Sequence, residues 1–210
     1  RRIKASSKDD FTLDLEESEQ KNNWEIDLLP TLVVDQITVD NILYDGPRFV
    51  LKGGYLVTED SWLPSYELEG FYYHLWARDF NFASHVLLGK KPSNKVSSRY
   101  FLGGFDTVRG LPDGVMSGPT AAYANFELRH LSWRSQLVWL QTAAFVDCGS
   151  AAQSFSKLQL EAAAGFGIRI SIPYVHRLML RIDYAWGLGS HKTHGISAAL
   201  NQFFQAYSPL

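Results

Sequence analysis

The sequence lacks the features that define several common protein classes. It has a single cysteine, Cys148, so no disulfide can form within the chain, and no cysteine and histidine spacing of a zinc site is present. No uninterrupted apolar run approaches the roughly 18 residues of a transmembrane helix. The formal net charge is only −2, with both signs interspersed, so no basic surface for nucleic acid is expected. Zinc modules, helical membrane anchors and nucleic-acid partners are therefore set aside.

Sequence signatures of catalysis are also missing. No G-x-S-x-G, P-loop or glycine-rich nucleotide fingerprint follows a predicted strand and opens a helix. His191 and His194, in the polar stretch HKTH, could touch a metal, but without further ligands a solvated loop is favoured. The carboxylates alternate with basic residues, and mutual pairing explains them without catalysis. We expect no enzyme activity, no cofactor and no metal.

What the sequence does have is alternation of apolar and polar residues with a period of two, the pattern of β-strands. Each segment runs for about nine to eleven residues, the length that a tilted strand needs to cross a bilayer. We expect about ten such strands after a flexible lead-in over residues 1–10. The clearest segments are 11–16, 24–40, 49–58, 66–76, 80–88, 122–129, 138–147, 164–171, 178–186 and 196–204.

Two architectures fit this alternation, a soluble β-sandwich and a membrane barrel. The arginines, acids and glycines of the polar face favour the hydrogen-bonded lumen of a barrel. Short turns, such as Arg78-Asp79, alternate with longer polar loops, as in outer-membrane barrels. We also expect a turn over Tyr44–Pro47 and weakened pairing at Pro30. The prediction is an all-β fold: one antiparallel transmembrane β-barrel over residues 1–210.

One loop, residues 99–118 with the sequence RYFLGGFDTVRGLPDGVMSG, is too long and irregular for a hairpin turn. Gly103 and Gly104 allow the backbone to fold tightly, and Arg109 stands between Val108 and Gly110. We interpret it as an ordered loop that delivers a guanidinium to a defined place. A mobile surface loop with an incidental arginine is the open alternative.

A lumenal Arg109 would need a carboxylate partner, because an unpaired buried guanidinium is strongly unfavourable. Glu127 and Asp147 are the candidates, since both lie on the polar face of their strands. Phe145 shares that face with Asp147, so its ring could lie against the same guanidinium. Lumenal acids and bases also pair merely to satisfy one another, and residue types alone do not separate these interpretations.

Five segments carry a resemblance by their order and spacing: FLGGFDTVRGL at 101–111, NFELR at 125–129, FVDCG at 145–149, GFGIRISIP at 165–173 and LRIDYAWGL at 180–188. Together they resemble the C-terminal half of an Omp85-superfamily barrel, and the resemblance covers roughly residues 35–205. In that family the long extracellular loop with the Val-Arg-Gly motif folds inward into the barrel. The resemblance therefore implies Val108, Arg109 and Gly110 as the loop motif and Glu127, Phe145 and Asp147 as its lumenal partners. TVDN at residues 38–41 resembles the family's T-R-D-N element, with valine in place of the usual arginine.

The resemblance implies an outer-membrane protein, of a Gram-negative bacterium or an organelle of bacterial origin, that acts without chemistry in membrane-protein insertion or polypeptide translocation. Its partners would be the lipid bilayer and unfolded or nascent polypeptides, and its mechanism a seam between the first and last strands. Family members generally have about sixteen strands and periplasmic POTRA domains, whereas this chain has room for about ten strands and no POTRA domain. It is therefore either part of a longer protein or a reduced member. The alternative function is a loop-plugged structural or homo-oligomerising barrel, and a small solute pore is a third.

Overall fold

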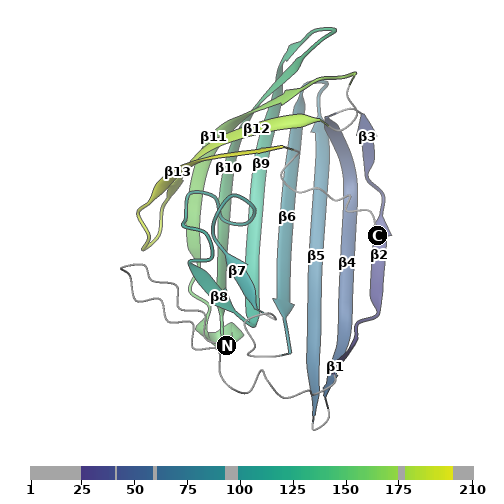
Figure 1. Cartoon of the computed structure of the whole chain (residues 1–210). Coiled ribbons are helices and arrows are strands. Elements are labelled where there is room, and N and C mark those ends of the chain that lie inside the picture. The colour runs from purple at the N-terminus through teal and green to yellow at the C-terminus, as the bar shows by residue number, and fades with distance from the viewer. Residues whose placement is uncertain (1–24, 41, 59–60, 93–98, 175–177, 201–210) are drawn as a thin grey trace, which may run out of the picture.

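The computed structural model describes residues 25–40, 42–58, 61–92, 99–174 and 178–200, and these form an antiparallel all-β fold (Figure 1). One sheet follows the path β1-β4-β5-β6-β9-β10-β11-β12-β13, and a small separate sheet pairs β7 with β8. In the described part of the chain, no helix is long and apolar enough to cross a membrane. The all-β antiparallel architecture predicted from the alternation is confirmed.

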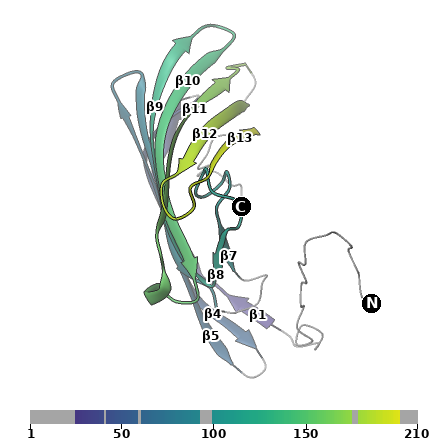
Figure 2. The ribbon, with the colours of Figure 1, turned by 90° about the vertical axis from the view of Figure 1, so that its left-hand side faces the viewer.

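The main sheet is strongly curved and has a concave face (Figure 2). Between the described residues of its two edges, β1–β3 and β13, no pairing occurs, and the strand predicted at 11–16 lies outside the described residues. The long strands are β4 (Leu43–Thr58), β5 (Trp62–Trp76), β6 (Phe80–Lys90), β9 (Thr120–Arg134), β10 (Trp139–Ala152), β11 (Glu161–Ser171), β12 (Met179–Gly187) and β13 (His194–Leu200).

The first edge consists of three short strands that pair with successive stretches of β4: β1 (Glu25–Leu28), β2 (Thr31–Asp35) and β3 (Thr38–Asp40). One register runs through all three, from Glu25 opposite Thr58 to Asp40 opposite Leu43. Strand assignment stops around Pro30, where we expected weakened pairing. The edge is thus one interrupted strand.

The turn predicted over Tyr44–Pro47 is wrong, because these residues lie inside β4, and the chain reverses instead between the end of β3 at Asp40 and the start of β4 at Leu43. Gly46 has φ +110°, and a Cβ there would lie 2.3 Å from the carbonyl oxygen of Gln36. The glycine therefore serves a close approach between β4 and its neighbour, not a reversal of the chain. The turn predicted at Arg78-Asp79 does connect β5 with β6.

The two faces of the sheet are inverted relative to a soluble protein. Arg129 and Arg169 have no exposed surface, whereas their outward neighbours Leu128 and Ile168 are 44% and 37% exposed. Apolar side chains thus cover the outside and charged ones fill the inside, as in transmembrane β-barrels. This inversion is what a soluble sandwich would not show.

In the long connection between β6 and β9, residues 99–118 lie against the concave face of the sheet (Figures 1 and 2). Within it, β7 (Tyr100–Leu102) pairs with β8 (Met116–Gly118). The phenol of Tyr100 donates a 2.7 Å hydrogen bond to Glu67 on β5, which connects β7 to the main sheet. The tip between these two strands carries the Val-Arg-Gly motif.

Candidate functional site

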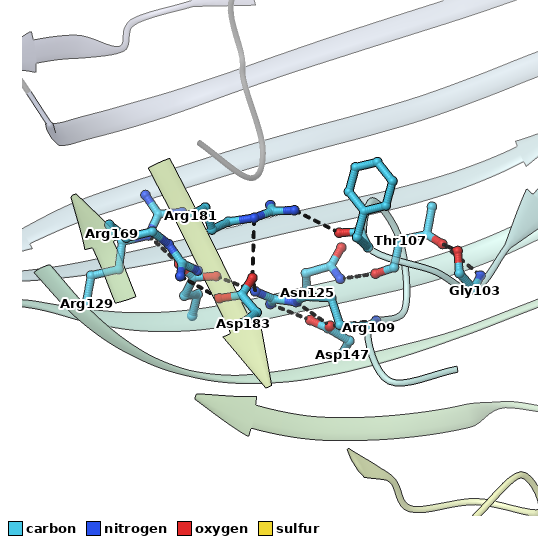
Figure 3. A network of polar contacts seen from close by, with 11 residues as sticks. Gly103, Thr107, Arg109, Asn125, Arg129, Asp147, Arg169, Arg181 and Asp183 are labelled. Atoms are coloured by element: carbon cyan, nitrogen blue, oxygen red, sulfur yellow. Dashed lines mark hydrogen bonds and ion pairs between the residues drawn. The ribbon is translucent and has the colours of Figure 1, made fainter. Parts of the chain in front are cut away.

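The loop tip is ordered by its own hydrogen bonds. The Gly103 N–H donates to the Thr107 hydroxyl over 2.8 Å, and that hydroxyl donates back to the Gly103 carbonyl over 3.0 Å (Figure 3). The Gly104 N–H donates to the Leu111 carbonyl over 3.0 Å. Gly103 and Gly104 have φ +113° and +79°, a region that favours glycine. The two glycines thus close the tip into a compact ring that presents Arg109.

Arg109 is almost fully buried and bonds carboxylates from two neighbouring strands (Figure 3). Its Nε and Nη2 donate to the two oxygens of Asp147 over 2.8 and 2.9 Å, a bidentate pair, and its backbone N–H donates to Asp147 over 3.1 Å. Its Nη1 donates to Glu127 over 2.9 Å. The loop is therefore joined to β9 and β10 through one side chain.

The Phe145 ring covers the guanidinium. The Arg109 Cζ lies 3.3 Å from the ring centroid, a close cation–π contact. Gly165 on β11 lies opposite Phe145, and a Cβ at that position would be 2.5 Å from the ring atom Cζ. The absence of a side chain at Gly165 therefore leaves room for the aromatic ring.

Asp183 on β12 extends the network beyond the residues expected from the sequence. Arg109 Nη1 donates to its Oδ2 over 3.2 Å, and Arg169 Nη1 donates to its Oδ1 over 2.5 Å. Arg181 lies 3.3 Å from it and also donates to the Phe105 carbonyl of the loop. Asp183 thus joins the loop to β11 and β12 as well.

Glu127 is shared in the same way. Its Oε2 accepts from Arg109, while its Oε1 accepts from Arg129 Nε over 2.7 Å and from Arg169 Nη2 over 2.9 Å.

Burial alone would lower the pKa of the Arg109 guanidinium, but hydrogen bonding to Asp147 and the charges of Asp147, Glu127 and Asp183 hold that pKa above its ordinary value. Arg109 therefore remains charged inside the sheet.

A family model, the Omp85 superfamily domain, matches residues 8–204. The chain belongs to the Omp85 superfamily. No individual curated protein matches it. The superfamily in general consists of proteins for insertion and translocation in the outer membrane of Gram-negative bacteria and related organelles.

The Omp85 loop motif and its expected partners occupy one site. Val108 is fully buried and packs with Leu111 and Ala163. Gly110, at φ +84°, lies against β12: a Cβ there would be 3.0 Å from Ala185. By contrast, Thr38–Asp40 of the TVDN element lies in β3, on the first edge of the sheet, and Asn41 lies outside the described residues.

Several members of the Omp85 site were not singled out from the sequence: Asp183, Arg129, Arg169 and Arg181. Period-two alternation assigns each to the polar face of its strand, but it does not give the register between strands. Gly167 is a sequence feature that could have pointed to two of them, because a side chain there would collide with both. Its Cβ would be 1.9 Å from Asp183 Oδ1 and 2.7 Å from Arg169 Nη1. Among the described residues, no group of three or more His, Cys, Asp and Glu side chains is arranged to hold a metal ion.

Proposed function

We propose that this Omp85 barrel acts without catalysis in the insertion or translocation of outer-membrane or secreted polypeptides. In this proposal the inward loop stiffens the C-terminal half of the sheet, and the seam between the first and last strands is the part that moves. The observation that carries it is the set of contacts of Arg109, whose one guanidinium bonds acids on β9, β10 and β12.

The contacts of strands β9 to β12 differ from those of the β1–β3 edge, and we infer that the edge is the more mobile part of the sheet. Strands β9 to β12 share a charged, buried network in which each carboxylate accepts from two or more donors. The opposite edge has no strand assigned at Leu29-Pro30 or Gln36-Ile37. Interrupted pairing makes an edge easier to open and a site for strand exchange. We infer that a client polypeptide is engaged at this edge.

The test is a seam tether in proteoliposomes that report the folding of an added outer-membrane protein. In a Cys148→Ser background, Leu200→Cys on β13 is paired in turn with Leu32→Cys, Val33→Cys and Val34→Cys on β2. The expected result is that oxidation forms an intramolecular crosslink and stops client folding, and that reduction restores it. The control is a tether between Leu180→Cys and Leu200→Cys, which are already register partners on β12 and β13 and should leave activity unchanged.

A loop-plugged structural barrel is the second candidate. It is favoured by the deep burial of Val108, Arg109 and Leu111, because a barrel of few strands is filled by side chains and a single loop. Under this alternative the untethered protein has no effect on client folding. Predominantly intermolecular crosslinks from Leu200→Cys would then identify an oligomer that shares its sheet.

A further inference from the structure

A second loop, residues 188–193 between β12 and β13, contacts the tip of the inward loop. The Thr193 hydroxyl donates a 2.6 Å hydrogen bond to the carbonyl oxygen of Gly110, the residue that follows Arg109. Thr193 directly precedes His194, the first residue of β13. One side chain therefore connects the start of the last described strand to the Val-Arg-Gly motif.

The position of Thr193 is itself fixed by the β12–β13 connection. The Gly187 N–H donates to the Thr193 carbonyl over 2.8 Å, and the Thr193 N–H donates to the His191 carbonyl over 2.9 Å. Gly187 also lies close to the inward loop, since a Cβ there would be 2.9 Å from Leu111 Cδ2. The hydroxyl is therefore held in place by backbone bonds on both sides.

Glu161, at the start of β11, holds the other end of this connection. Its carboxylate accepts a hydrogen bond from the Ser190 hydroxyl and lies 3.4 Å from His191 Nδ1. Gly189 makes the close approach possible, because a Cβ there would be 2.0 Å from Glu161 Oε2. The connection is thus attached to β11 at one end and to the inward loop at the other.

We propose that Thr193 is a positioning residue that couples β13 to the inward loop. In this proposal the order of the loop tip and the order of β13 depend on each other. This inference rests on the proposed function for its purpose, since β13 forms one side of the proposed seam. A coupling of this kind is reciprocal: whatever frees the loop loosens β13, and the converse also holds.

The first experiment measures maleimide labelling of a reporter cysteine, Asp106→Cys, on the exposed part of the inward loop in a Cys148→Ser background. Thr193→Val should raise the labelling rate about fivefold, the change that loss of one ordinary hydrogen bond produces. Thr193→Ser keeps the hydroxyl and should label at the parental rate. Thr31→Val makes the same replacement at an exposed threonine on the opposite edge and should also have no effect.

The second experiment tests reciprocity with a reporter on β13, Ser197→Cys. Arg109→Ala should raise its labelling rate, and adding Thr193→Val should produce no further rise, because the connection is then already uncoupled. The proposal is overturned if Thr193→Val labels at the parental rate, if Thr193→Ser labels as fast as Thr193→Val, or if Ser197→Cys does not respond to Arg109→Ala. Neither assay requires a client polypeptide, so its outcome is independent of whether client folding is observed.

Discussion

The guanidinium of Arg109 lies 3.3 Å from the centroid of Phe145 while it is bidentate to Asp147, two residues further along the same strand. Residues two apart on a strand point to the same face, so β10 supplies the aromatic surface and the counter-charge together. This arrangement binds arginine by shape as well as by charge, and it makes the loop contact sensitive to small changes.

Arg109→Ala is expected to destabilise the folded protein by about 3–5 kcal/mol, because it leaves the buried Asp147 without its guanidinium partner and removes one donor each from Glu127 and Asp183. The measurement is urea unfolding in lipid vesicles, followed by the change in gel mobility between folded and unfolded forms. Arg78→Ala, at an exposed arginine in the β5–β6 turn, is the control and should be close to neutral. Equal stability of the two variants would show that the Arg109 contacts are energetically unimportant.

A double-mutant cycle of Arg109→Ala and Asp147→Ala should be clearly non-additive. Each single change orphans a buried charge, whereas the double change removes both, so its cost should be less than the sum of the two single costs. Unfolding free energies of the four proteins give the coupling directly. Additivity within error would contradict a direct energetic link between the residues.

Arg109→Lys should restore only part of the stability lost in Arg109→Ala. An ammonium keeps the charge but lacks the planar fork that reaches both oxygens of Asp147, and it packs less well on the Phe145 ring. The same unfolding assay should place this variant between wild type and alanine. Full rescue by lysine would mean that charge alone matters at this position.

Asp183→Asn tests the part of the site that lies beyond Arg109. The amide keeps the shape but removes a charge that Arg109, Arg169 and Arg181 share. We expect destabilisation of about 3–5 kcal/mol, as for the loss of one partner from a buried ion pair. A neutral result would assign the stability of the loop to Asp147 and Glu127 alone.

Gly165→Ala should disturb the site without touching any charge. Its Cβ would lie 2.5 Å from the Phe145 ring and 2.2 Å from the Tyr184 carbonyl, so ring and backbone must shift, at a cost of about 1–3 kcal/mol. Gly53→Ala, in β4, has no atom within 4 Å of its new Cβ and should be neutral or slightly stabilising. Unfolding midpoints compare the pair, and equal effects would exclude the steric explanation.

The sequence predicted much of this fold because side-chain direction alternates regularly along a strand. Glu127, Phe145 and Asp147 could be placed on the polar face for that reason. Asp183 could not be placed beside them, because its position depends on the register of β11 against β10 and β12, which alternation does not encode. The error at Tyr44–Pro47 has a similar origin: Gly46 next to Pro47 reads locally as a turn, while its actual role depends on Gln36 across the hairpin.

The contacts of Arg109 also have a direction along the chain. Its acids lie 18, 38 and 74 residues after it, on strands that are synthesised later than the loop. Contacts this distant in sequence form late in folding, since the entropy of closing each intervening stretch must be met first. The guanidinium therefore completes its set of bonds only when β12 has joined the sheet. The inward loop therefore reaches its full set of contacts only when this half of the protein has folded. A chain that ends before Asp183 would contain the loop but would lack the bond from Arg109 to β12.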